Sequence, residues 1–511
     1  MSVPVFVRWF LADYARNRVN LLLLVVVPVV FVGVVANTMA DAAQLLGGPA
    51  GPAVQTATAG WAAAFLAGIG TYFQTAATRE ADQRLVIAGL TAARLVTARL
   101  LTGLALTLLA SATALLALAV RTGIDAPARV VPGTMMFAVI YVAIGTVVGS
   151  LVHNAVNGTV VVLFIWIVDV FFGPAMGAAD RLATRWLPTH FVTLWLVDLP
   201  SGFGGRPGDL GWALAWTGGA SVAAWALAVA RTHRGRPRMR PGKWVTKPGS
   251  ATDQLAAASR GVWRDAGRNL VMWALFIVVP VIFILTADAV TPSRTIRLTV
   301  DEHGEPITQT FAMPDVHGAT MAPIAIASLA ALVGLFTLLD SRDADNRSAL
   351  AGLRPGVLLT ARLGMLCTAA LAATAVSLAT TALVFHAVRW PTYAAGNVLI
   401  ALTYGLIGAL LAPIFGRVGG VFMAFLLPFL DIGITQSPML HPEPAGWAKL
   451  LPGYGGSRIL LDGALTRGFD EPIPLLIAGV WLAALAVTVA LAYHRVTRPA
   501  TTPSEQATKT H

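Results

Sequence analysis

Long apolar runs joined by short polar segments make up most of the sequence. A helix of about 20 apolar residues is long enough to cross the bilayer core, and the chain contains twelve runs of roughly this length. They lie at residues 19–36, 56–77, 95–120, 132–152, 157–173 and 211–230, and at residues 269–286, 320–339, 357–385, 394–415, 418–435 and 473–493. The pattern predicts an all-α polytopic membrane protein with twelve transmembrane helices.

The second six runs repeat the first six. A charged segment at residues 79–90, Arg-Glu-Ala-Asp-Gln-Arg and onward, recurs at 342–353 as Arg-Asp-Ala-Asp-Asn-Arg, and 12 of the 23 positions that begin at these two segments are identical. Shared apolar composition does not produce such a match among charged residues. We expect two six-helix halves, residues 1–245 and 246–511. They form a parallel repeat, because six crossings return the chain to its starting side.

Charge indicates the orientation of these halves. Cytoplasmic loops are enriched in Lys and Arg, and residues 231–268, between the halves, hold ten of the 36 basic residues. We therefore expect both termini in the cytoplasm. The net charge of +11 is interpreted as topology and contact with membrane lipid headgroups. No nucleic acid is expected as a partner, because the charge is dispersed among membrane-flanking loops.

Other compositional features indicate where the protein resides. Arg outnumbers Lys 32 to 4 and Ala is abundant, as in GC-rich bacterial genomes, so we expect the bacterial plasma membrane. The chain has one cysteine, Cys367, so no internal disulfide is expected. No cleavable signal peptide is expected at the start of the chain, where a basic region followed by an apolar stretch is missing.

Mixed charge distinguishes the repeated segments from simple topology signals. Acidic and basic residues alternate in both copies, whereas orientation alone needs only Arg and Lys. This pattern favours a short helix that docks on another protein; a solvated loop would carry the same charges. The candidate docking residues are Arg79, Glu80, Asp82, Arg84, Gly89, Arg342, Asp343, Asp345, Arg347 and Gly352.

Two carboxylates lie inside apolar runs. Asp169 and Asp431 occur at matched places in the fifth run of each half, and an unpaired charge at such depth costs about 2.5–3.5 kcal/mol. Each could cap the junction with the segment that follows, or line a watered pathway for cationic or amphipathic substrates. Phe73 and Phe336 are further candidates for the substrate pathway.

Segments outside the apolar runs also carry predictions. Aromatic and charged residues at 6–18 and 260–268 predict helices along the cytoplasmic interface, either as topology anchors or as partner contacts. The segments after the fifth run of each half are rich in Gly and Pro, and we expect re-entrant or surface helices there. Alternation around residues 301–304 predicts a β-hairpin outside the membrane.

Together these features resemble the permeases of the ABC-2 type export family, in the fused twelve-span form of some bacterial exporters of drugs and polyketide antibiotics. The resemblance implies two permease halves whose segments 79–90 and 342–353 are coupling helices that contact an ABC ATPase, present in two copies. It implies that ATP and Mg²⁺ bind to that partner, with no cofactor on this chain. Arg84 and Arg347 depart from the family pattern Glu-x-x-x-Gly-Thr-Leu, at its Gly. The implied function is export of hydrophobic or amphipathic compounds.

Catalytic motifs are missing from the sequence. It has no Gly-x-x-x-x-Gly-Lys-Ser/Thr loop, no Gly-x-Ser-x-Gly elbow and no metal-ligand spacing among its nine His residues, so no catalytic or metal site is expected. A proton-coupled transporter of the major facilitator type would also have twelve spans, although its Gly-x-x-x-Asp-Arg-x-Gly-Arg-Arg pattern does not occur. A subunit of a lipid or glycolipid exporter, and a membrane enzyme or scaffold, are also compatible with the composition.

Overall fold

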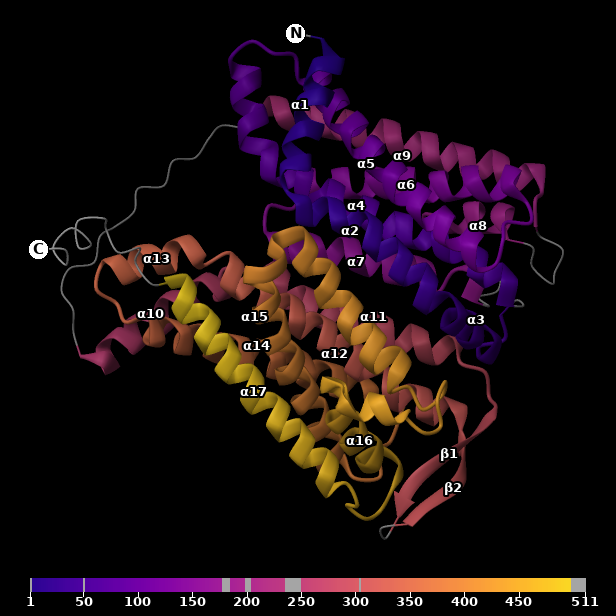
Figure 1. The fold of residues 1–511 in the computed structure, drawn as a ribbon, viewed down its shortest axis with the longest axis vertical. Helices are drawn as coiled ribbons and strands as arrows, with labels where there is room; N and C mark the ends of the chain where they lie inside the picture. Colours follow the sequence, from indigo (N-terminus) through magenta and orange to yellow (C-terminus); the bar gives the residue numbers. More distant parts are fainter. Residues whose placement is uncertain are drawn as a thin grey trace, which may run out of the picture.

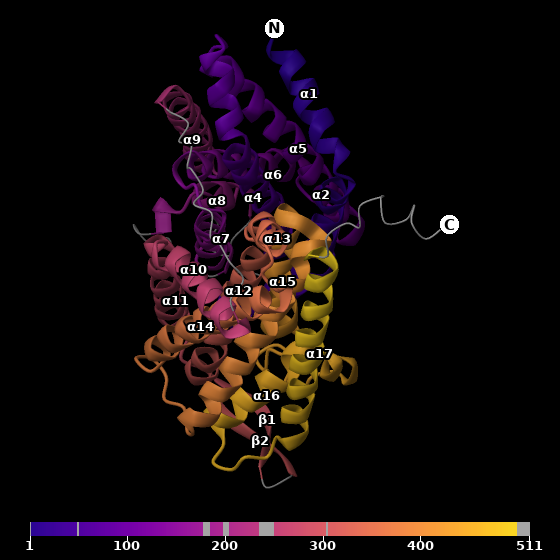
Figure 2. The same cartoon turned by 90° about the vertical axis from the view of Figure 1, so that its left-hand side faces the viewer.

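Two bundles of long helices, one from each half of the chain, lie side by side (Figure 1; Figure 2). The computed structural model describes residues 2–48, 51–176, 184–197, 204–234, 250–302 and 305–497. The first bundle contains α1 (Val3–Arg16), α2 (Arg18–Val30), η1 (Phe31–Val35), α3 (Ala36–Leu45), α4 (Gly51–Ile87), α5 (Ala92–Arg121), α6 (Pro127–Leu151), α7 (Ala155–Phe171), η2 (Pro174–Met176), η3 (Thr184–Trp186), α8 (His190–Leu196) and α9 (Pro207–Arg234). The second contains α10 (Ala251–Gly267), α11 (Leu270–Val290), β1 (Thr295–Glu302), β2 (Glu305–Ala312), α12 (Met313–Leu339), α13 (Arg342–Leu350), α14 (Pro355–Thr381), α15 (Trp390–Pro428), η4 (Phe429–Thr435), η5 (Gly446–Leu450), α16 (Pro452–Leu465) and α17 (Pro472–Thr497).

The predicted apolar runs all coincide with helices. Within the described residues, nine helices are long and apolar enough to cross a membrane. Two further runs form α4, of 37 residues, and α7, of 17 residues. One more shares α15 with its neighbour, since α15 kinks at Gly416, whose φ of 64° glycine adopts without strain. The all-α polytopic class is confirmed, and the twelve-span layout stays a prediction.

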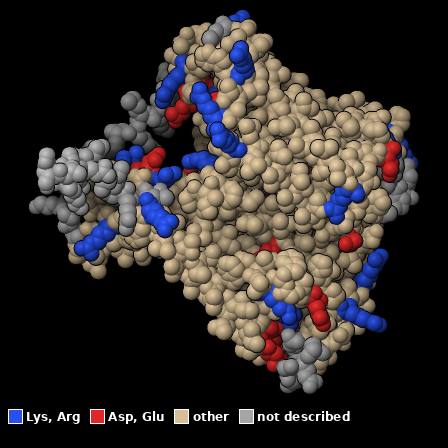
Figure 3. Space-filling view, in the orientation of Figure 1, with Lys and Arg blue, Asp and Glu red and all other residues tan. Residues whose placement is uncertain are grey.

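Charged side chains gather at the two ends of the bundles. Figure 3 shows Lys and Arg at the upper left and left of the view, over the end that carries α1, α10 and α13, and again at the lower right near the β-hairpin. The wide band between them carries almost no charge. Large apolar side chains are exposed on helices that cross this band, including Leu22, Val222 and Leu476. Apolar surface of this extent is suited to contact with lipid.

Glycines allow the second and fourth helices of each half to pack closely. A Cβ atom at Gly145 of α6 would collide with the carbonyl oxygen of Gly68 on α4. A Cβ atom at Gly408 of α15 would collide with the carbonyl oxygen of Ala331 on α12. Small residues permit backbones to approach in this way inside membranes. The equivalent contact in each half therefore holds in place the helix that precedes the charged segment.

The predicted helices before the first span of each half are α1 and α10. An Asn separates each from the span that follows: the Asn17 side chain accepts a hydrogen bond from the backbone N–H of Asn20, and that of Asn269 accepts one from Met272. Such caps satisfy N–H groups that a helix start leaves free. The break lets α1 and α10 take a direction different from that of the spans.

The remaining predictions concern the opposite end. The β-hairpin is confirmed: β1 and β2 are antiparallel, with Thr295 opposite Ala312. The short helices α8 and α16 occupy the segments where re-entrant or surface helices were expected; α8 packs on α6 and α9, and α16 on α15 and α17. Parts of the first Gly- and Pro-rich segment, 177–183 and 198–203, and much of the basic linker, 235–249, lie outside the described residues.

Candidate functional site

An apolar cavity of about 140 Å³ lies between the two bundles. Its walls come from α3 and α7 of the first half and from α11, α12 and the end of α15 in the second. Residues 437–440, which begin the segment after the fifth span, also line it, so the cavity lies toward the hairpin end. The lining includes the apolar side chains Met39, Phe164, Phe172, Phe283, Met321 and Phe429. An apolar space with few polar groups suits a hydrophobic small molecule.

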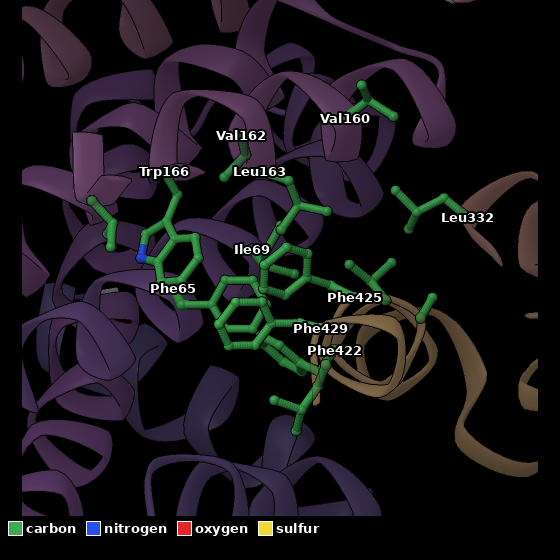
Figure 4. Packing of buried hydrophobic residues seen from close by; sticks show 14 of the residues in the cluster. Phe65, Ile69, Val160, Val162, Leu163, Trp166, Leu332, Phe422, Phe425 and Phe429 are labelled. Carbon is green, nitrogen blue, oxygen red and sulfur yellow. The ribbon is translucent and has the colours of Figure 1, made fainter. Parts of the chain in front are cut away.

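Aromatic rings from both halves pack together beside this cavity. Phe65 of α4 lies 5.0 Å from Phe422 and 5.3 Å from Phe425 of α15, measured between ring centroids. Trp166 of α7 lies 5.0 Å from Phe65 and 5.5 Å from Phe425. Figure 4 shows these rings gathered into one cluster between the halves. Because each such pair contributes about 0.5–1.5 kcal/mol beyond burial, the cluster holds the two halves together.

Phe73 and Phe336, the aromatic candidates for the substrate pathway, contact each other across the interface. Their ring centroids are 6.3 Å apart and their planes differ by 30°. Both side chains are buried. Neither lines the cavity. Since they lie near the charged ends of α4 and α12, the pair occupies the interface between the cavity and the end predicted to be cytoplasmic.

Two polar side chains of α12 line the cavity. Nδ1 of His317 lies 2.5 Å from the hydroxyl of Thr291, and the buried Oγ of Ser328 has no hydrogen-bond partner among the described residues. Both residues line the cavity, and eleven residues correspond to three helical turns, so they lie on one face. Neither was predicted from the sequence, because an isolated His or Ser in an apolar run forms no pattern.

Asp169 joins three elements of the first half. Its buried carboxylate accepts hydrogen bonds from the hydroxyl of Tyr141 at 2.9 Å, from the backbone N–H of Thr189 at 3.1 Å and from the Thr189 hydroxyl at 2.8 Å. Tyr141 is on α6, and Thr189 directly precedes α8. A buried carboxylate that accepts several hydrogen bonds is compensated for the loss of water.

Asp431 makes the corresponding contacts in the second half. It accepts hydrogen bonds from the hydroxyl of Tyr404 at 2.5 Å, from the backbone N–H of Gly453 at 2.8 Å and from the Gln436 amide at 3.3 Å. Gly453 begins α16. Neither Asp169 nor Asp431 lines the cavity. Of the two interpretations of these carboxylates, the geometry favours the cap between the fifth span and the outer helices.

The charged segment of the first half continues α4 instead of forming a separate short helix. Asp82 faces inward, where its carboxylate binds Arg99 of α5 through hydrogen bonds of 2.9 and 3.2 Å. Gly89 has a φ of 97°, and Leu90 N–H donates to the carbonyl of Leu85. This is the usual glycine end of a helix, so Gly89 has a structural role.

In the second half the segment is a separate helix, α13. Asp345 is buried and lies 2.9 Å from Arg362 of α14, and its second oxygen accepts a hydrogen bond from the Tyr493 hydroxyl at 3.0 Å. Gly352 ends this helix with a φ of 96°. Seventeen residues separate acid and Arg in both halves, so the same ion pair ties each charged segment to the next span.

The other charged candidates differ in exposure. Arg79 is half-buried, whereas Glu80, Arg84, Arg342, Asp343 and Arg347 are exposed. Beside them lie two large apolar side chains that were not predicted as docking residues: Ile87 is 71% exposed and Leu350 is 75% exposed. They occupy equivalent positions in the two repeated segments, and this repetition in the sequence could have identified them as docking residues. Exposed apolar residues ringed by charge are typical of protein contact sites.

Comparison with known proteins bears on the first half. The sequence model of the family described as ABC-2 family transporter protein matches residues 56–230. These residues cover α4 with its charged end, α5 to α8 and most of α9. No curated protein matches the chain.

Proposed function

We propose that this chain, whose residues 56–230 match the ABC-2 family of transporter proteins, is the membrane subunit of an ATP-driven exporter of hydrophobic or amphipathic compounds. The observation that carries the proposal is the apolar cavity between the halves, which has the lining expected for such compounds. The location in a bacterial plasma membrane with both termini in the cytoplasm is part of the same proposal, supported by the distribution of basic residues.

In this proposal, the energy of ATP hydrolysis is transmitted to the chain through the two charged segments. Each carries an exposed apolar residue, Ile87 or Leu350, next to exposed charges, which supports docking of one ATPase subunit on each. ATP and Mg²⁺ belong to those subunits. The buried pairs Asp82–Arg99 and Asp345–Arg362 then connect each docking segment to the following span. A movement of the ATPase therefore moves α5 and α14 with the segments.

Transport in this scheme is a change in access to the cavity. The Phe73–Phe336 pair and the cluster around Phe65 occupy the interface on the side away from the hairpin. This arrangement fits a state closed toward the cytoplasm. Movement of the two segments would separate the rings. A ligand drives such a shift between two states only to the extent that its affinities for the two states differ.

His317 and Ser328 support amphipathic substrates over purely apolar ones. They present polar atoms on one face of an otherwise apolar cavity. A few placed polar groups fix the orientation of a ligand in an apolar pocket. A lipid or glycolipid would fit the same chemistry, and export of such molecules is the second candidate, favoured by the exposed apolar helix faces.

A cavity-filling variant tests this function. Ala287 of α11 lines the cavity, whereas Ala274 of the same helix is exposed on the outside of the bundle. Inverted vesicles containing the chain and its ABC ATPase are given ATP and ethidium, a hydrophobic cation. We expect Ala287→Trp to abolish ATP-dependent uptake and Ala274→Trp to retain it. Full uptake by Ala287→Trp would contradict the proposed pathway.

A further inference from the structure

A second, polar pocket of about 40 Å³ lies between the ends of α4, α5, α6 and α9 that carry the charged segment. Figure 1 and Figure 2 both place α9 at the outside of the first bundle. The pocket is separate from the apolar cavity and lies at the end predicted to be cytoplasmic. Its polar lining includes Thr75, Thr78, Arg79, Arg99, Ser150 and Arg231.

Positive charge exceeds negative charge in this pocket. Asp82 is the acid that lines it, and its carboxylate is already occupied by two hydrogen bonds from Arg99 and one from Thr78. Arg79 and Arg231 have no ion pair with any residue that the structure describes. The Nη1 atom of Arg79 is buried without a hydrogen-bond partner in the same part of the chain. A buried donor without an acceptor is unfavourable by about 1–3 kcal/mol, and more when it is charged.

The electrostatics of the neighbouring groups agree with this excess. Burial lowers the pKa of Arg79, and the positive charge of Arg231 lowers it further. Burial also lowers the pKa of His153, next to the end of α6, and Arg79 adds to that effect. The positive charges of Arg79 and Arg231 thus repel each other around one small space. An anion inside the pocket would relieve this repulsion and accept the unused hydrogen bond.

The corresponding pocket of the second half is lined by one basic residue, Arg342, where the first is lined by Arg79, Arg99 and Arg231. There the pocket is lined by Arg342, Asp345 and mainly apolar residues of α12, α15 and α17. The Tyr493 hydroxyl donates a hydrogen bond to the carboxylate of Asp345, and the Arg342 side chain is exposed. The additional positive charge occurs in the first pocket only, so a role that both halves share, such as docking, does not explain it.

We propose that the pocket around Arg79 and Arg231 binds a phosphate group at the cytoplasmic face. Guanidinium groups bind phosphate oxygens through several charge-assisted hydrogen bonds, and the hydroxyl-bearing Thr75 lines the same pocket. The phosphate belongs either to an anionic phospholipid of the inner leaflet or to a free phosphate in solution. Binding brings α4 and α9 together directly beside the Asp82–Arg99 pair.

Calorimetric titration of the purified full chain in detergent tests the proposal. One arm uses dioctanoyl phosphatidylglycerol and the other uses inorganic phosphate. We expect saturable binding in at least one arm, weakened about tenfold or more in Arg79→Gln and in Arg231→Gln, because a charge-assisted hydrogen bond is lost. The arm that binds identifies the source of the phosphate. Arg231 is exposed, so its substitution leaves the fold intact even if Arg79→Gln does not.

Arg342→Gln is the matched control, since Arg342 occupies the same position in the second half. It should retain the wild-type affinity, and Arg79→Lys should keep part of it. The proposal is overturned if neither ligand binds saturably, or if Arg79→Gln and Arg231→Gln bind as tightly as Arg342→Gln. The titration needs no transport activity, so its failure leaves the proposed export function untouched.

Discussion

The guanidinium group of Arg99 lies 2.9 Å from the carboxylate of Asp82 and joins the charged end of α4 to α5. The ring of Phe10 on α1 lies 3.5 Å from the same guanidinium group, so three elements meet at one side chain. In the second half Arg362 pairs with Asp345 at 2.9 Å, and Tyr493 of α17 is the third contributor. Each charged segment is therefore tied to the membrane helices through an acid that faces inward.

Loss of the buried acid should destabilise the protein. Breaking a buried ion pair leaves an unpaired charge and costs about 3–5 kcal/mol. We expect Asp345→Ala to lower the thermal unfolding temperature in detergent clearly. Glu80→Ala is the control, because its pair with Arg84 is exposed and contributes about 0–1 kcal/mol. Equal unfolding temperatures for both variants would show that the buried pair has no such role.

The carboxylates of the fifth spans should act mainly in stability. Asp431→Asn removes the charge that accepts hydrogen bonds from Tyr404 and Gly453, each worth about 1.5–3 kcal/mol. We expect a lower unfolding temperature, and equal loss of ethidium and of a neutral dye in vesicle transport. The exposed Asp343→Asn serves as control for stability. A selective loss of ethidium transport at wild-type stability would instead favour a role in the pathway.

Docking of the ATPase should depend on the two exposed apolar residues. Ile87→Ser together with Leu350→Ser removes both, and we expect the ATPase to separate from the chain during gel filtration. Leu383→Ser is the control, because Leu383 is 74% exposed but follows α14 at the hairpin end.

Charge at the same segments should matter for docking as well. Reversal of charge at Arg79, Glu80, Arg342 and Asp343 should also release the ATPase during gel filtration, because these residues belong to the same charged segments as the exposed apolar residues. Retention of the ATPase by both sets of variants would contradict the assignment of the segments.

The Phe73–Phe336 pair should limit leakage through the interface. Phe336→Ala removes one ring of the stack, so we expect ethidium to equilibrate across proteoliposomes without ATP. Phe469→Ala, in the loop before α17, is the control, since Phe469 is 44% exposed. Tight proteoliposomes with Phe336→Ala would show that different side chains close the path.

Much of the architecture could be predicted because it depends on local patterns. Length and hydropathy indicated the helices, and alternation around a turn indicated the β-hairpin. The inward direction of Asp82 also follows from helical periodicity, since residues two positions apart, such as Glu80 and Asp82, lie on nearly opposite sides. Asp82 and Asp345 each precede their Arg partner by 17 residues, so both ion pairs could have been predicted from the sequence.

Further features depend on contacts between distant segments. The first charged segment continues α4, whereas the second is a separate helix after α12. Asp340, at the end of α12, forms a 2.7 Å ion pair with Arg417 beside the kink at Gly416. The first half has Ala77 in the place of Asp340, so it cannot form this pair. The cavity combines side chains from elements remote in sequence, so no local pattern contained it.

The source of energy is the most direct test of the central claim. Inverted vesicles with the chain and its ABC ATPase are given ethidium, and uptake is followed with ATP, with ATP and a proton ionophore, or with a proton gradient alone. We predict uptake with ATP that survives the ionophore and disappears when the P-loop Lys of the ATPase is replaced by Ala. Uptake driven by the proton gradient alone, without ATP, would contradict ATP-driven export and identify a secondary transporter.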